Sequence, residues 1–393
     1  MDIQNVYIGG WFQRTMLQLS EIYTFLKDAK SQLKLDPALL EEHRKNLNIG
    51  SLDYNVSGEE YIIITTGQNI DVKIFEDGLI VLKNKNVTKE TLLSDIDKLT
   101  DYYENKFSPA ISYLFSLGAP IPKELANIET IYPYFVVCKN SNRDEIMELL
   151  SQTDRQKYFE ISNEKYDVVR GDKFYFINNK NKDLHTIERY IEEEVFVREF
   201  KGQLHRYLNI HRIVWEQIDD VKSNTKVKGK DIVKFNSKLN NIAKTINLID
   251  GRIKQMGTYV STREKIAKAD KDLEEFLAIS GYKYETLRNT LEYIKSLWVM
   301  TQNHVSSAQK LFGSLSSSVT SRSVKGLTIV TSMTAGATII DLFTKSQPTL
   351  SWFGVVYFIL LAAIGWGSTK VLNFFSTQKT YTISDSDYEK DIK

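Results

Sequence analysis

The chain has 393 residues, with 51 lysine and arginine residues against 50 aspartate and glutamate residues, a length that allows two or three domains. This near balance excludes a nucleic-acid surface built on bulk positive charge, so we expect no direct nucleic-acid binding. The single cysteine, Cys138, excludes an intramolecular disulfide and a cysteine-based zinc site, which suits a reducing compartment. The first residues lack a basic segment followed by a long apolar run, so no cleaved signal peptide is expected.

Residues 1–183 are expected to form a cytosolic α+β domain. Alternating apolar residues over 61–87, with turn signals at Gly67-Gln68-Asn69 and Asp77-Gly78, predict a meander of strands. Further strands are expected over 131–140 and 157–179, and helices over 14–34, 88–118 and 142–152. The second of these strand regions turns at Gly171-Asp172.

Residues 184–322 are expected to form a region of long stalk helices. No proline occurs between 139 and 347, and apolar residues recur at helical spacing over 184–222, 231–280 and 282–322. Weak breaks are expected near 223–231 and 280–284. No strong stop signal follows Gly281, so a helix over 282–344 could run for about 90 Å. A plain coiled-coil spacer is the alternative.

Residues 323–375 are expected to form a hairpin of two transmembrane helices, at about 326–344 and 350–370, before a cytosolic tail over 376–393. No charged residue occurs over 326–340 or 346–369, and Trp352 and Trp366 flank the second segment as headgroup-level aromatics do. Basic residues lie outside both ends, while the loop with Pro348 carries only one lysine. The hairpin therefore predicts a protein of the inner cell membrane, in contact with the lipid bilayer, with both termini cytoplasmic. A buried hairpin of a soluble core is the alternative.

The first predicted span has a face of small and hydroxyl side chains. Helical spacing places Thr328, Thr331, Ala335 and Thr338 on this face, and Ile329, Met333, Gly336 and Ile340 on the other. Several copies around an axis could turn the hydroxyl face toward a water-filled pore, with Asp341 and Lys345 at its outer mouth. Close packing of two helices is the other use of small residues.

Signals of catalysis are poor, so the chain is not expected to be an enzyme. No histidine pair has the spacing of a zinc protease helix, and no glycine-rich loop of the GxxxxGK type occurs. His205 and His211 are six residues apart and lie on different faces of a helix. The acidic run Glu192-Glu193-Glu194 and the pair Asp219-Asp220 are read as solvated helix faces in preference to cation sites. No cofactor is expected, and metal ligands remain unknown.

The order of these parts resembles the CorA family of divalent-cation channels. The segment SVKGLTIVTSMTAGATII over 323–340 resembles the first membrane helix of that family, in which a Leu-Thr-Ile core lines the pore. The resemblance implies a homopentameric pore. The Gly-Met-Asn signature that recognises magnesium in the family is replaced here by DLFTKSQP over 341–348, and Lys345 would repel divalent cations.

Divergent CorA-like proteins associated with type III CRISPR systems, gated by nucleotide second messengers, resemble this departure in architecture. We therefore expect a CorA-like channel, gated by a ligand on its cytosolic domain, with a nucleotide or a divalent cation as that ligand and a role in antiviral defence. The residues that would bind the ligand are not predicted. A constitutive magnesium transporter and a membrane-anchored scaffold without a pore are the alternatives.

Overall fold

The structure is a computed structural model. It describes residues 1–12, 18–115, 133–154, 156–162, 164–180, 184–223, 226–344 and 379–382, with isolated residues between 352 and 378. These residues divide into two compact units, one of 1–209 with 248–296 and one of 210–247 with 297–393.

The first unit is built on a nine-stranded sheet in the order β2-β3-β4-β5-β1-β6-β9-β8-β7. The only parallel pair among its described strands is β6 with β9, and all other neighbours run antiparallel. The strands are β1 (Asp2–Trp11), β2 (Ile49–Asn55), β3 (Tyr61–Thr66), β4 (Ile70–Phe75), β5 (Leu79–Lys85), β6 (Tyr134–Lys139), β7 (Lys157–Ser162), β8 (Tyr166–Gly171) and β9 (Phe174–Asn179). An α+β domain with a mainly antiparallel sheet is therefore confirmed.

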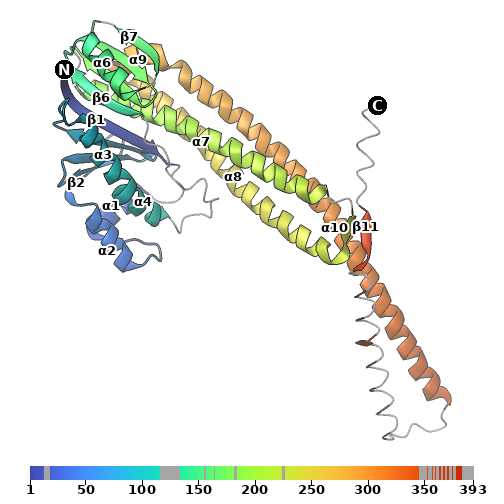
Figure 1. Ribbon diagram of the computed structural model, residues 1–393. Helices are drawn as coiled ribbons and strands as arrows, with labels where there is room; N and C mark the ends of the chain where they lie inside the picture. The colour runs from blue at the N-terminus through green and yellow to red at the C-terminus, as the bar shows by residue number, and fades with distance from the viewer. Residues whose placement is uncertain are drawn as a thin grey trace, which may run out of the picture. The chain divides into compact units, whose positions relative to one another are not determined.

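Helices cover both faces of this sheet. The helices α1 (Leu19–Asp28), α2 (Pro37–Asn46), α3 (Leu92–Tyr102), α4 (Ser108–Phe115) and α6 (Arg143–Thr153), with the π-helical turn η1 (Tyr103–Phe107), share one core with Val6 and Ile8 of β1. Figure 1 shows α1, α3 and α4 on this face of the sheet. On the opposite face, Trp11 packs on Phe196 of the long helix α7 (Leu184–Lys222), with ring centroids 5.8 Å apart. Side chains alternate between the two faces because the strand repeat is two residues.

The predicted long helices are present. Besides α7, the chain forms α8 (Gly229–Ala269), the short helices η2 (Lys271–Leu273) and α9 (Glu274–Ser280), and α10 (Tyr282–Thr344). α10 is a single helix of 63 residues, as predicted over 282–344. The helix expected over 231–280 is interrupted at Asp270, where α8 has ended, and η2 and α9 continue the helical structure to Ser280, although no proline or glycine marks the break.

The second unit holds the α7–α8 turn and the outer part of α10. Phe235 of α8 lies against Phe312 of α10, with ring centroids 5.7 Å apart, and Gln309 Nε2 donates to Asn240 Oδ1 at 2.7 Å. The turn contains β10 (Lys226–Lys228), which pairs antiparallel with β11 (Thr380–Thr382). Gly229 N also donates to the carbonyl of Lys379 at 3.0 Å. The segment after residue 378 is thereby joined to the α7–α8 turn.

Candidate functional site

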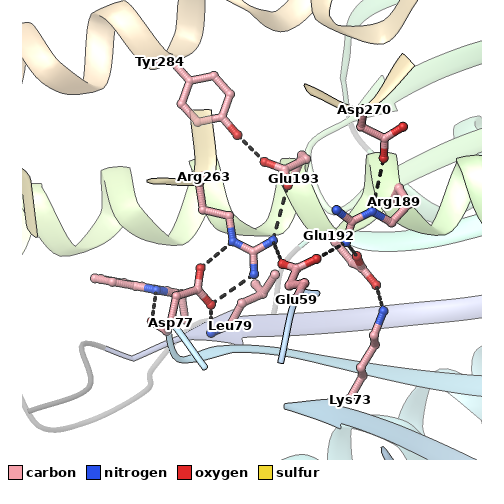
Figure 2. A network of polar contacts seen from close by, with 11 residues as sticks. Glu59, Lys73, Asp77, Leu79, Arg189, Glu192, Glu193, Arg263, Asp270 and Tyr284 are labelled. Carbon is pink, nitrogen blue, oxygen red and sulfur yellow. Dashed lines mark hydrogen bonds and ion pairs between the residues drawn. The ribbon is translucent and has the colours of Figure 1, made fainter. Parts of the chain in front are cut away.

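A buried arginine, Arg263 of α8, joins the long helices to the sheet in the first unit (Figure 2). Its side chain is 1% exposed. Its guanidinium contacts the carboxylate of Asp77 in the β4–β5 turn through Nε and, at 3.1 Å, through Nη2. Its Nη1 lies 2.8 Å from Glu59 Oε1 and 3.4 Å from Glu193 Oε1 of α7. One cation therefore serves three carboxylates from three parts of the chain.

A second arginine, Arg189 of α7, extends this network. Its Nη1 lies 2.6 Å from Glu59 Oε2 and 2.8 Å from Glu192 Oε2, and its Nε lies 3.5 Å from Asp270 Oδ2. Glu192 Oε1 in turn accepts from Lys73 Nζ of β4 at 2.7 Å. Because Glu59 contacts both arginines, the two clusters form one network across α7, α8 and the sheet.

Electrostatics in this network reflect its burial. Desolvation raises the pKa of Glu193 to about 7, although the guanidinium of Arg263 opposes the rise. Burial alone would lower the pKa of Arg263, but the carboxylates of Asp77, Glu193 and Glu59 together outweigh it and the pKa is raised. Removing one partner of such a buried set leaves uncompensated charge, so the network fixes the positions of its helices on the sheet.

A pocket of about 190 Å³ lies next to the network and is lined by residues of α7 and of the start of α10. Four cationic side chains line it, Arg170 of β8, Arg198 and Lys201 of α7, and Lys283 of α10, against the single carboxylate of Glu194. Lys283 Nζ and Glu194 Oε1 form an ion pair whose two side chains are 18% and 8% exposed. The pocket is therefore strongly cationic.

Aromatic rings complete the wall of this pocket. Phe135 of β6 and Tyr175 of β9 stack with centroids 5.1 Å apart, and Tyr282 begins α10. The guanidinium of Arg170 lies 5.9 Å from the ring centroid of Tyr175, within cation–π distance. None of these residues was singled out from the sequence. The available signal was a charge within an apolar run, as in VVRG around Arg170 and FVREF around Arg198.

The solvated helix face expected for Glu192-Glu193-Glu194 is wrong. The three residues are 3%, 6% and 7% exposed and each has a cationic partner, respectively Lys73, Arg263 and Lys283. Successive residues of a helix point about 100° apart, so one acidic run can reach three neighbouring elements. Asp219 of the other acidic pair lies 2.9 Å from His304 Nε2.

No three His, Cys, Asp or Glu side chains lie close enough together to bind a metal ion in the described ranges.

His211 packs against Trp215 and Trp298, with ring centroids 5.9 Å and 5.7 Å away. Burial lowers its pKa. His211 is thus part of an aromatic cluster in the second unit.

The pore residues predicted from the sequence lie on α10. Thr328, Thr331 and Ala335 are exposed in the single chain, and Thr331 Oγ1 donates to the carbonyl of Thr328 at 3.0 Å. Thr338 and Asp341 belong to the same helix, and Lys345 lies outside the described residues. A role in lining a pore stays a prediction.

No helix in the part of the chain that the structure describes combines the length and apolar character needed to cross a membrane. The spans predicted over 326–344 and 350–370 stay predictions, and the second lies outside the described residues apart from isolated positions.

No protein-family model and no curated protein matches the chain. Similar solved structures include the complete CorA magnesium transporter from Methanocaldococcus jannaschii, at 8% identity over 63% of this chain and 90% of that chain, with a TM-score of 0.26. The soluble domain of CorA from the same organism has 9% identity over 47% and 89%, with a TM-score of 0.25. The full-length CmaX protein has 10% identity over 61% and 88%, with a TM-score of 0.26. Scores of this size do not establish a shared fold.

Proposed function

We propose that the chain is a CorA-like membrane channel that assembles from several copies and opens when a ligand binds its cytosolic α+β domain. Its two membrane spans are 326–344 and 350–370, and the first lines the pore. The number of subunits, five, and a role in antiviral defence come from the resemblance of the sequence to the CorA family and its divergent relatives.

The observation that carries this proposal is the pairing of β11 with β10. The register joins Val227 to Tyr381, and Lys379 accepts a hydrogen bond from Gly229. Phe312 of α10 packs on Phe235 of α8, and Phe235 follows Gly229 by six residues in the sequence. The chain thus passes the beginning of α8 along α10, and by residue 379 it lies beside the α7–α8 turn. An outward and returning path over about 65 residues is what a two-span hairpin requires.

Exposed apolar residues in the returning segment support the same proposal. Among its described residues, Trp352, Ile359, Trp366 and Phe374 are 77%, 61%, 66% and 60% exposed. Lys370 Nζ lies 4.1 Å from the ring centroid of Trp366. Large exposed apolar side chains mark interaction surfaces, and tryptophan beside lysine is typical of a membrane interface.

The exposed hydroxyl face of α10 supports self-association around a pore. Thr328, Thr331 and Ala335 are exposed. In lipid such a face is better placed toward other copies or toward water. The hydroxyl groups also make the first span less apolar than the second, which a pore-lining helix tolerates.

The test is the mass of the purified full chain in detergent, followed by ion flux from liposomes, including magnesium flux, with and without nucleotides. An oligomer whose flux rises with a ligand supports the proposal, because a ligand opens a channel only if it binds the open state more tightly. A monomer that passes no ion contradicts it and favours a membrane-anchored scaffold.

The hairpin itself is tested by cysteine pairing. Tyr381→Cys combined with Val227→Cys should form a disulfide in membranes, because the two residues are cross-strand partners. The native Cys138 is buried and does not interfere. Val227→Cys combined with Thr344→Cys, at the other end of α10, is the matched control and should not cross-link. Equal cross-linking of the two pairs contradicts the returning path.

A further inference from the structure

The cationic pocket of the first unit has more positive charge than its own carboxylate can neutralise. Arg170, Arg198, Lys201 and Lys283 face one acid, Glu194, and that acid is already paired with Lys283. A cavity walled in this way attracts anions, because low-dielectric walls strengthen the field of unpaired charges.

Two of these cations are the strongest evidence for an anionic ligand. Arg170 and Arg198 form no ion pair with any carboxylate in the described part of the chain. Burial lowers the pKa of Arg198 and the positive charge of Arg170 adds to this, whereas the charges of Glu199 and Asp172 oppose it. Neither acid forms an ion pair with Arg198, and a bidentate anion such as phosphate could contact both guanidinium groups directly.

The remaining wall suits a flat ring. Phe135 and Tyr175 stack on each other and are each 1% exposed, whereas the ring of Tyr282 at the start of α10 is 68% exposed and open to a ligand. The cavity of about 190 Å³ is smaller than the roughly 300–1,000 Å³ of sites for drug-sized ligands. It therefore favours a compact ligand over an extended one.

We propose that this pocket binds a compact phosphorylated compound with a planar ring, in chemical class a nucleotide, with Arg170 and Arg198 on the phosphate and the ring against Tyr282. Its role as the gating ligand rests on the proposed function, whereas its binding does not.

The pocket also has a direct connection to α10. Glu194 and Glu193 are consecutive on α7 and hold consecutive residues of α10, since Glu194 pairs with Lys283 and Glu193 accepts from Tyr284 Oη. A phosphate in the pocket competes with Glu194 for Lys283. Binding therefore acts on the first turn of the helix that continues to Thr344.

Binding is measured on the full-length protein in detergent by isothermal titration calorimetry with AMP, inorganic phosphate and adenosine. We expect saturable binding of AMP, weaker binding of phosphate and no binding of adenosine. Arg198→Gln should weaken binding about 10-fold or more, since it removes a charge-assisted hydrogen bond. Arg212→Gln is the matched control, because Arg212 lies on the same helix, is 75% exposed and is outside the pocket.

Glu194→Gln gives an opposite and more demanding prediction. This change removes the carboxylate that competes for Lys283, so the affinity for AMP should rise several-fold, which a damaged fold cannot produce. Unchanged binding in both Arg198→Gln and Glu194→Gln overturns the proposal, as does an affinity for adenosine equal to that for AMP. If AMP binds but does not change ion flux, the pocket is a binding site and its gating role is wrong. If the protein conducts ions but binds no AMP, the channel proposal stands and the binding proposal is wrong.

Discussion

Arg263 and Asp77 lie 186 residues apart in the sequence and form a two-pronged contact between α8 and the β4–β5 turn. The same aspartate caps its own turn, since Asp77 Oδ1 accepts from Leu79 N at 3.1 Å. A tight turn of the sheet is thereby made into a binding site for a helix of the long helical region.

Replacing Arg263 by methionine should destabilise the first unit strongly. Asp77, Glu59 and Glu193 would lose their shared cation, and breaking a buried ion pair from one side costs about 3–5 kcal/mol. Urea unfolding of the full chain in detergent, followed by tryptophan fluorescence, measures the loss. Lys98→Met is the control, because Lys98 is 66% exposed and pairs with Asp95 within one helix, where about 0.5 kcal/mol or less is expected. Similar losses in the two variants would contradict a structural role for the network.

Gly9 of β1 should not accept a side chain. A Cβ atom there would lie 2.7 Å from the carbonyl oxygen of Ile80 and 2.7 Å from Val195 Cγ1, so α7 approaches the sheet closely at this point. Gly9→Ala should cost about 1–3 kcal/mol of unfolding free energy. Gly202→Ala is the control, since nothing lies within 4 Å of its added Cβ, and it should stabilise α7 by about 0.5–1 kcal/mol. A neutral Gly9→Ala would show that α7 does not pack on β1 so closely.

Glu199 of α7 should make stability depend on pH. Burial raises its pKa to about 8, against the opposing effect of Arg198 and Arg206. Because the folded-state pKa lies above the unfolded value, its contribution to stability is fully present below about pH 4.5 and is lost as the pH rises toward 8. The slope is at most about 1.4 kcal/mol per pH unit. Unfolding at pH 5, 6.5 and 8 should show this decline in the wild type and a smaller one in Glu199→Gln. An identical profile in Glu199→Gln would assign the dependence to another group.

Thr331→Trp should block conduction by the proposed pore, because a large ring would replace a small hydroxyl on the face predicted to line it. Ion flux from liposomes measures the effect. Met333→Trp is the matched control, as helical spacing places Met333 on the opposite face of the same helix. Unchanged flux in Thr331→Trp, or an equal block in both variants, would remove Thr331 from the pore.

The sequence was sufficient for elements with local signals. The meander over 61–87 became β3, β4 and β5 because Asp77-Gly78 and Gly67-Gln68-Asn69 set its turns, and Asn69 has a positive φ of 62°. β1 was missed because both of its faces are buried, so it shows no alternation. α2 was also missed, although Asp36 before Pro37 is a helix start signal and Asp36 Oδ1 accepts from Ala38 N at 2.9 Å.

The candidate site could not be predicted in the same way. Lys73, Arg263 and Lys283 reach the glutamates of α7 from β4, α8 and α10, and no local pattern reports partners so far apart in the chain. The same holds for Arg170 and Arg198, which meet only once β8 and α7 pack together. The hydroxyl face of α10, by contrast, depends on helical spacing alone, and the role of Thr328, Thr331 and Ala335 in lining a pore stays a prediction.

The β10–β11 ladder joins residues 156 positions apart, from Lys226 to Thr382 (382 − 226). During synthesis α7, the α7–α8 turn and α8 are made long before β11. Val227, which is 2% exposed in the folded chain, therefore stays without its cross-strand partner Tyr381 until β11 has been made. A three-residue ladder of such high contact order adds little stability, but it can form only after residues 380–382 have been made and have reached the α7–α8 turn.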